Sequence, residues 1–304
     1  MRYGFVTFYS DQVARFAAGA GFDALEAFVD PGTSLDLNKL SDADIAHVTE
    51  DLGDLGIKLA TISCNPIHLD GDPARRAENN AYFKKAIRAC RKFGTDIVVT
   101  NAFADKCKTS CENLPAYKEV FAEYARMAEG EGVRIAIENC PHWVGYPTSA
   151  GNMAFSPEMW EAMFDAVPAK EIGLEFDPSH LVWQGIDYIR ALKEFSDRVV
   201  AFHAKDTEIL KEERYKYGII GKQIGRETDW DAGWYRFRIP GFGEINWKAI
   251  YNALYEIAYT GPIIIEHEDP VFGGDRSENG IDPGPRTEMG LRLGLAYLRE
   301  LELL

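Results

Sequence analysis

Residues 132–138 read Gly-Val-Arg-Ile-Ala-Ile-Glu, and the beginning of this pattern recurs along the chain. A glycine that can end a helix is followed by a short apolar run typical of a buried strand, and here the run ends in an acidic side chain. A glycine also precedes the next strand-like run at Gly21, Gly56, Gly94 and Gly261. Glycine adopts the left-handed conformation that closes many helices without steric cost. The repeat therefore predicts helices that return to parallel strands.

Eight short apolar runs of this kind alternate with longer helical patterns from one end of the chain to the other. The runs span residues 3–7, 24–28, 57–63, 96–101, 133–138, 172–177, 199–203 and 262–266. Between them, residues 41–55 and 77–93 space apolar side chains along one face, and Ser41 is a suitable N-cap. Such alternation is typical of parallel βα units, and eight units favour a closed barrel over an open sheet. The predicted fold class is α/β, a (β/α)8 TIM barrel.

The length of the chain suits one domain. A barrel of this kind needs about 250 residues, and this chain has 304 residues, 46% of them apolar. No linker or change in composition divides the sequence, so we predict a single domain over residues 1–304. Residues 206–244 are too many for a simple connection and mix charged with aromatic side chains. We expect them to form a long insertion after strand 7, on the active-site face of the barrel.

The composition restricts the partners of the protein. Lys and Arg total 33 against 48 Asp and Glu, which gives a formal charge of −15 at pH 7. Such a surface repels phosphate backbones and anionic lipids, so we expect no nucleic acid and no membrane as a partner. No run approaches the roughly 18 apolar residues of a membrane span, and the first residues lack the apolar core of a signal peptide. The five cysteines show no CxxC spacing, which indicates reduced thiols and a cytoplasmic location.

Each of the last four predicted strands ends in a carboxylate or an imidazole: Glu138, Asp177, His203 and Glu266. Side chains at the carboxyl ends of barrel strands point into the catalytic mouth, so these four should converge. Three buried carboxylates are costly unless they share a cation. An oxygen-rich set with one imidazole suits Mn²⁺, Mg²⁺, Co²⁺ or Fe²⁺ and does not exclude Zn²⁺. We predict one divalent metal ion at this position, with Mn²⁺ preferred.

Each of these ligands also has a purely structural interpretation. Asp177 precedes Pro178 and is a good N-cap for a helix that begins there. Glu138 and Glu266 could be ion-paired carboxylates, and His203 a buried histidine with ordinary hydrogen bonds. The occurrence of all four at strand ends favours the metal site.

Other polar and aromatic residues near predicted strand ends are candidates for contact with a substrate: Glu26, His68, Trp143, Lys205 and Asp206. Glu26 lies in the second strand and His68 follows the third, while Trp143 offers an apolar face to a sugar ring. A solvated carboxylate, core packing, or an ion pair between Lys205 and Asp206 explains these residues equally well.

Several short motifs occur in order on successive predicted strands. They are Glu138-Asn139, Asp177-Pro178-Ser179-His180, His203-Ala204-Lys205-Asp206, a Pro240-Gly241-Phe242-Gly243-Glu244 loop leading to Trp247, and Glu266-His267-Glu268-Asp269. Together they resemble the xylose isomerase-like superfamily of sugar phosphate isomerases and epimerases, over nearly the whole chain. The resemblance implies a TIM barrel with the four strand-end residues as metal ligands. It also implies that Glu138 and Glu266 are the acid/base pair of the reaction.

The superfamily includes ketose 3-epimerases, inosose dehydratases and the catalytic subunits of C-glycoside deglycosidases, so the resemblance alone does not select a reaction. Ketose epimerases carry a Glu six residues after the first metal Glu and an Arg six residues after the metal His. This chain has Val144 and Ile209 there, which argues against simple ketohexose 3-epimerase activity. His142 and His180 are further catalytic candidates, His180 for a hydrogen bond to substrate and His142 for protonation of a leaving group.

Three functions fit these residues. The first is a metal-dependent isomerase or epimerase of a sugar or cyclitol, which removes a proton next to a polarised carbonyl. The second is a lyase that acts on 3-keto glycosides by β-elimination, as resemblance to a C-glycoside deglycosidase subunit implies. The third is a barrel that binds carbohydrate without catalysis. We expect a homo-oligomer, and the deglycosidase resemblance implies an additional small β-rich subunit.

Overall fold

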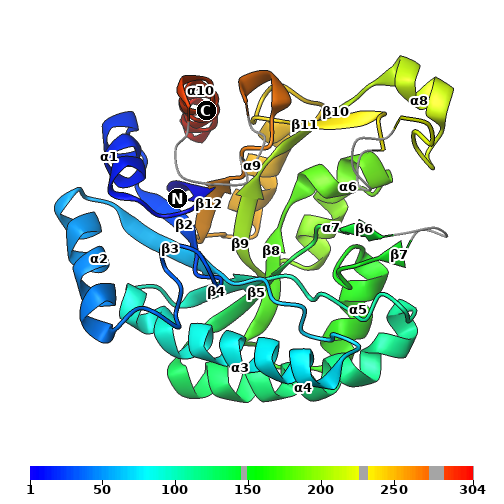
Figure 1. The fold of residues 1–304 in the computed structure, drawn as a ribbon. Helices are drawn as coiled ribbons and strands as arrows, with labels where there is room; N and C mark the ends of the chain where they lie inside the picture. The colour runs from blue at the N-terminus through cyan, green and yellow to red at the C-terminus, as the bar shows by residue number, and fades with distance from the viewer. Residues whose placement is uncertain (145–148, 226–231, 274–283, 304) are drawn as a thin grey trace.

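The computed structural model describes residues 1–144, 149–225, 232–273 and 284–303. Eight parallel strands form the centre of the fold: β1 (Arg2–Thr7), β2 (Ala24–Phe28), β3 (Lys58–Ser63), β4 (Ile97–Thr100), β5 (Arg134–Glu138), β8 (Ile172–Phe176), β9 (Val199–Ala204) and β12 (Pro262–Ile265). They close a barrel in the order β1-β12-β9-β8-β5-β4-β3-β2 (Figure 1). The predicted TIM barrel is therefore confirmed, and every predicted strand boundary lies within one residue of the observed one.

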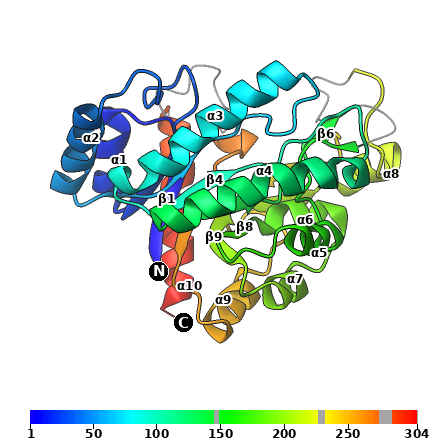
Figure 2. The same cartoon turned by 90° about the horizontal axis from the view of Figure 1, so that it is seen from below.

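Ten helices lie outside the barrel strands in the described residues, and all but α8 pack against the barrel. They are α1 (Asp11–Ala20), α2 (Asp42–Asp54), α3 (Pro73–Cys90), α4 (Ser110–Glu131), α5 (Pro157–Ala166), α6 (Pro178–Gln184), α7 (Tyr188–Glu194), α8 (Lys211–Tyr217), α9 (Trp247–Glu256) and α10 (Pro285–Glu302). Two short 3-10 turns, η1 (Arg91–Phe93) and η2 (Pro270–Phe272), complete the set in the described residues. Figure 2 shows α3 and α4 side by side, and the rings of Phe83 and Tyr124 pack between them with centroids 4.8 Å apart.

The local signals at helix ends explain most of these boundaries. Ser41 caps α2 as expected, because its side chain accepts a hydrogen bond from the Asp44 N–H while Asp44 bonds back to it. Helix α3 begins four residues earlier than predicted, because Asp72 caps it and a proline at the first helical position is well tolerated.

The glycine pattern holds at four of the five predicted positions. Gly21, Gly56, Gly94 and Gly132 have positive φ angles at the ends of their helices. The prediction for Gly261 was wrong, since Ala258, with φ 52°, is the left-handed residue after α9. A Cβ atom at Gly261 would come within 2.6 Å of the Tyr259 ring, so this glycine provides space for a side chain.

Two small antiparallel sheets stand outside the barrel. β6 (Trp143–Val144) pairs with β7 (Ser149–Ala150), and β10 (Asp206–Ile209) pairs with β11 (Tyr235–Arg238). Strand β10 follows β9 after a single residue, so this second sheet lies at the carboxyl end of the barrel strands. In Figure 1 it projects from the barrel together with α8. The described part of residues 206–244 contains β10, α8 and β11.

The two ends of the chain lie close together. The amino group of Met1 forms an ion pair with Glu302 at 3.0 Å, and both termini lie on the same side of the barrel in Figure 1. None of the helices in the described residues has the length and apolar character needed to cross a membrane.

Candidate metal centre

Four side chains converge at the carboxyl ends of neighbouring strands. Glu138 ends β5, Asp177 follows β8, His203 lies near the end of β9, and Glu266 follows β12. These strands are consecutive in the barrel, so the four residues form an arc. Each offers a ligand atom within 4.8 Å of the other three, and all four side chains are buried. The structure therefore brings together the complete set of predicted metal ligands.

The distances within the arc fit a single small cation. His203 Nδ1 lies 3.3 Å from Glu138 Oε1, 3.3 Å from Glu266 Oε2 and 4.0 Å from Asp177 Oδ2. An ion with bonds of about 2.1 Å places adjacent octahedral donors about 3.0 Å apart and opposite donors about 4.2 Å apart. The donor set is also chemically suitable, because carboxylates and imidazole are ligands of Mn²⁺, Fe²⁺ and Zn²⁺.

Asp177 combines the metal-site and the N-cap interpretations. Its Oδ1 atom accepts a hydrogen bond from the Ser179 N–H at 2.8 Å and thereby caps α6. Its Oδ2 atom accepts no aligned hydrogen bond from the described residues and faces the arc. The side chain of Asn139 holds this position from β5, because it donates to the Asp177 carbonyl and accepts from the Asp177 N–H.

Two basic side chains lie against the same carboxylates. Lys205 is almost completely buried, with Nζ 3.2 Å from Asp177 Oδ2, 2.5 Å from Glu266 Oε2 and 3.0 Å from Glu268 Oε2. Burial disfavours its charge, but the surrounding carboxylates, Asp177 first, hold the pKa of Lys205 well above its usual range. His180 Nε2 lies 3.6 Å from Glu138 Oε1 and 3.5 Å from Asp177 Oδ2. Both side chains thus contact carboxyl groups of the candidate metal ligands.

Strand β11 covers these two basic side chains. The Phe237 ring lies 4.5 Å from Lys205 Nζ and 5.1 Å, edge to face, from the His180 ring. An aromatic face stabilises an ammonium group and excludes water from it. Tyr235, two residues earlier, stacks on Trp183 with centroids 4.9 Å apart. Strand β11 therefore packs against the two side chains that contact the candidate ligands.

A cavity of about 390 Å³ opens directly above the arc. Its size matches a small-molecule site. One part is aromatic, where Phe8 and Phe28 pack with centroids 4.8 Å apart. Another part is polar, where Asn101 donates to Asn65 at 3.0 Å. The described residues that line the cavity are Val6, Phe8, Glu26, Phe28, Asp30, Pro31, Thr33, Ser63, Asn65, Val99, Asn101, Phe103, Glu138, His142, Glu175, His203 and Glu266.

Two of the further predicted residues line this cavity. Glu26 is buried and accepts a hydrogen bond from Thr61 at 2.6 Å. His142 adopts a positive φ of 46°, rare for a residue with a side chain, and packs edge to face against Phe103. Lys205 and His180 contact the ligands as described above but do not belong to the lining. The side chain predicted at Trp143 lies outside those that the structure describes.

The expected substrate contact of His68 needs correction. His68 is fully buried, and its two ring nitrogens form hydrogen bonds with Tyr124 at 3.1 Å and Thr100 at 2.8 Å. The rings of Phe83 and Phe121 pack against it. The connection after β3 carries this histidine into the aromatic layer under α3 and α4, away from the cavity.

Asp206 is also structural rather than a substrate contact. Its carboxylate accepts hydrogen bonds from the N–H groups of Thr207, Gly241 and Ile245 and from the Trp247 indole, at 2.8 to 3.1 Å. It therefore ties the segment after β11 to the end of β9. The alternative considered above, an ion pair with Lys205, is absent among the described contacts, since Lys205 pairs with Asp177, Glu266 and Glu268.

Glu175 is the main residue of the site that the sequence reasoning missed. It is fully buried on β8, with Oε2 3.1 Å from His203 Nε2. Burial and the nearby Glu26 carboxylate hold the pKa of Glu175 well above its usual range. The signal was present: side chains two apart on a strand share a face, so Glu175 had to point the same way as Asp177. Asn152 was also missed, and it donates to the Glu138 and Cys140 carbonyls.

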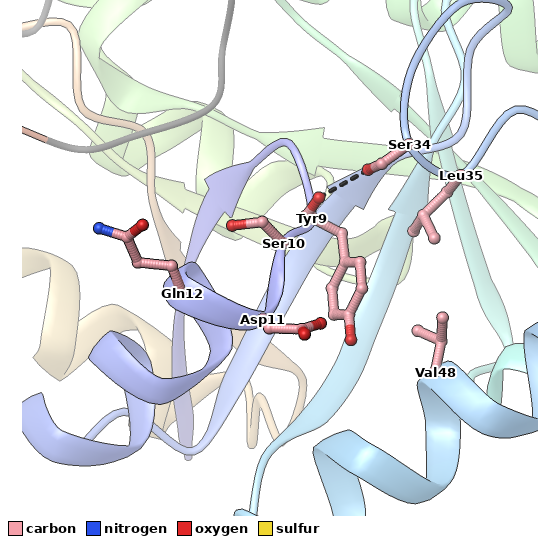
Figure 3. Close-up of a pocket in the computed structure, with 7 residues that line it drawn as sticks. All are labelled: Tyr9, Ser10, Asp11, Gln12, Ser34, Leu35 and Val48. Carbon is pink, nitrogen blue, oxygen red and sulfur yellow. Dashed lines mark hydrogen bonds between the residues drawn. The ribbon is translucent and has the colours of Figure 1, made fainter.

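A second hollow, of about 460 Å³, lies beside the start of α1 (Figure 3). Ser34 donates a hydrogen bond there to the Tyr9 carbonyl at 2.6 Å. Among the residues that the structure describes, those around this hollow include a single acid and no histidine, cysteine or basic side chain. Its lining is Tyr9, Ser10, Asp11, Gln12, Ser34, Leu35 and Val48.

Comparison with known proteins extends these findings. Residues 14–301 match the family described as xylose isomerase-like TIM barrel. The chain is 28% identical over 250 residues to an inosose isomerase of Bacillus velezensis. The aligned residues cover 82% of this chain and 80% of that protein. It is 28% identical over 161 residues to an inosose dehydratase of Lactiplantibacillus plantarum, covering 53% of this chain and only 46% of that relative.

A solved structure shows the same fold. The crystal structure of the IOLI protein with a binding zinc atom superposes with a TM-score of 0.67 at 19% identity, over 100% of this chain and 97% of that chain. The family match, the closed barrel and the whole-length superposition all indicate the same TIM barrel fold. This chain belongs to the xylose isomerase-like TIM barrel family.

Proposed function

We propose that this protein is a divalent-metal-dependent isomerase or epimerase of a sugar or cyclitol. The observation that carries the proposal is the arrangement of Glu138 and Glu266. Both line the cavity, and each places a carboxylate oxygen 3.3 Å from His203 Nδ1. They come from the two outer strands of the arc, so they approach the metal position from opposite ends.

This arrangement suits proton transfer at a carbon next to a carbonyl. A cation held by Glu138, Asp177, His203 and Glu266 would polarise the substrate carbonyl and make the neighbouring C–H more acidic. One glutamate then accepts the proton and the other returns a proton, to the neighbouring carbon in an isomerase or to the opposite face in an epimerase. Lys205 donates a hydrogen bond to Glu266 Oε2 at 2.5 Å and holds this carboxyl group in place.

The cavity favours an uncharged polyol as substrate. Its described lining contains no Lys or Arg, the residues that commonly bind phosphate groups. The amides of Asn65 and Asn101 are suited to sugar hydroxyl groups, and Phe8 and Phe28 offer an apolar surface to a ring. Similarity to an inosose isomerase, and to a zinc-binding protein of the same fold, supports both the substrate class and the metal. We expect Mn²⁺ as the preferred ion, with Zn²⁺ as the alternative.

Isotope exchange tests this proposal directly. The protein, freed of metal and reloaded with Mn²⁺, is incubated in D₂O with a panel of inososes, free ketoses and 3-keto glycosides, and C–H signals are followed by NMR. We expect deuterium at a carbon next to the carbonyl together with an isomeric product. Glu138→Gln should reduce this exchange by at least about 100-fold. Binding of a sugar without exchange would instead indicate a non-catalytic barrel.

A lyase is the second candidate. His142 lines the cavity, where it can protonate a leaving group after the same first proton removal, and one relative is an inosose dehydratase. Elimination from a 3-keto glycoside would release the aglycone, and elimination from an inosose would release water. The same incubation distinguishes the reactions, because only the lyase yields an unsaturated product. His142→Ala should then abolish elimination and leave C–H exchange largely intact.

A further inference from the structure

Glu175 lies inside the barrel below the candidate metal centre, and the proposed reaction gives it no task. It is 0% exposed, and neither carboxylate oxygen accepts an aligned hydrogen bond from the residues that the structure describes. A buried acid without such partners destabilises the folded chain. An apolar residue would fill the same interior position at lower cost, so the acid requires another explanation.

The ring of His203 separates two groups of carboxylates. Its Nδ1 atom faces Glu138 and Glu266, each at 3.3 Å, on the side of the metal ligands. Its Nε2 atom faces Glu175 Oε2 at 3.1 Å and Glu26 Oε1 at 3.6 Å. Glu26 is engaged by the Thr61 hydroxyl through its other oxygen. Glu175 is therefore the nearest acceptor for a proton on Nε2.

We propose that Glu175 is a positioning residue that orients His203 for the metal. A neutral imidazole carries one proton, and Nδ1 can bind a cation only when that proton is on Nε2. A carboxyl oxygen that accepts a hydrogen bond from Nε2–H selects this form and fixes the plane of the ring. The inference rests on the proposed metal site and adds the residue that keeps its one nitrogen ligand in the binding orientation.

A second cation held by Glu26, Glu175 and Nε2 is the alternative use of this cluster. Their ligand atoms also lie within 4.8 Å of one another. Two cations would require both ring nitrogens of His203 as ligands, so the imidazole would have to lose its remaining proton as well. The single-ion arrangement needs no such step, and we therefore expect one ion per chain.

Metal binding by the full-length protein tests the assignment without a substrate. Mn²⁺ and Co²⁺ are titrated calorimetrically into wild type, Glu175→Gln, Glu175→Leu and Asp269→Asn, and the visible spectrum of bound Co²⁺ is recorded. Gln retains an acceptor oxygen and Leu does not. Asp269 is the matched control, since it is fully buried and ion-paired with Arg238 but has no contact with His203.

We expect one ion per wild-type chain. Glu175→Leu should bind it about 10 to 100 times more weakly and alter the Co²⁺ spectrum, while Glu175→Gln stays within about threefold of wild type. Asp269→Asn should lose stability but retain metal affinity and spectrum. Equal affinity of the Leu variant, or two ions per wild-type chain, would overturn the role of Glu175 while leaving the proposed function intact. Absence of metal binding by wild type would overturn both.

Discussion

Asp177 shows how one carboxylate can serve both the fold and the site. Its Oδ1 atom caps α6, and its Oδ2 atom lies in the arc of ligands, 3.2 Å from Lys205 Nζ. The two interpretations of an Asp before a proline are therefore compatible, because a carboxylate has two oxygens that point in different directions.

Substitution of Asp177 should separate these roles. Asp177→Asn keeps an oxygen that can cap α6 but removes the charge, so metal affinity should fall at least tenfold while stability changes little. Asp177→Ala should lose the cap as well, at an additional cost of about 1 kcal/mol. Calorimetric titration with Mn²⁺ and urea unfolding measure the two effects. Unchanged metal affinity of the Asn variant would exclude Asp177 as a ligand.

His68 should make the folded protein sensitive to acid. Burial lowers the pKa of His68 to about 3, well below the usual value for histidine. Between pH 6.5 and 3 the unfolded chain therefore binds a proton at this residue that the folded chain does not bind. Stability is lost as the pH falls, by at most about 1.4 kcal/mol per pH unit.

The comparison with His68→Gln isolates this contribution. The variant carries no group that titrates at this position, so its stability should fall less steeply between pH 6.5 and 5. Urea unfolding of both proteins at half-unit steps of pH gives the two slopes. Parallel slopes would mean that the buried histidine is protonated in the folded chain.

At the scale of elements, the twofold repeat of a strand explains how the site is supplied with side chains. β8 and the residue after it present Glu175 and Asp177 on one face, and β9 with the residue after it presents His203 and Lys205 on one face. In each pair one residue is a ligand candidate and the other contacts a ligand. The residues that contact the candidate ligands, Glu175 and Lys205, thus come from the same strands as two of the ligands themselves.

The connection between β10 and α9 depends on Asp206. Asp206→Ala would leave four donors without an acceptor, three of them buried, so we expect a loss of at least about 3 kcal/mol in the free energy of unfolding. Asp206→Asn should cost less, because its amide oxygen can still accept. Chemical unfolding monitors stability, and metal titration of the folded fraction should give wild-type affinity. A selective loss of metal affinity would instead connect Asp206 to the site.

At the scale of the whole molecule, barrel closure concentrates acidic side chains. Five buried carboxylates, Glu26, Glu138, Glu175, Asp177 and Glu266, gather around one imidazole, in a chain that already carries a formal charge of −15. Lys205 offsets only part of this charge. A divalent cation that binds the folded chain should therefore stabilise the whole barrel.

Metal addition should raise the melting temperature. At a free Mn²⁺ concentration 100 times the dissociation constant, binding adds about 2.7 kcal/mol, which corresponds to a shift of about 5 °C. Scanning calorimetry after chelation, and again after addition of Mn²⁺ or Zn²⁺, measures it. Mg²⁺ serves as a comparison for weak binding, and K⁺ at matched ionic strength controls for screening. The absence of a shift with every divalent ion would contradict the metal site.

The strand boundaries, the Ser41 cap, the closed barrel and the four strand-end residues could all be predicted from the sequence. Strands and caps depend on side-chain period and on neighbours a few residues apart, and eight βα units leave few topologies to choose from. Convergence of Glu138, Asp177, His203 and Glu266 then follows, because parallel strands present their carboxyl ends at one face.

Only the tertiary structure decided how the remaining polar residues are used. Barrel closure brings Glu26 of β2 and Glu175 of β8 to the same nitrogen of His203, although these strands are not neighbours in the sheet. His68 enters the aromatic layer and Asp206 ties down a loop, although both follow strands in the sequence as a substrate-binding residue would. Their partners are distant along the chain and become neighbours only when the barrel closes, so no local pattern of residues encodes these contacts.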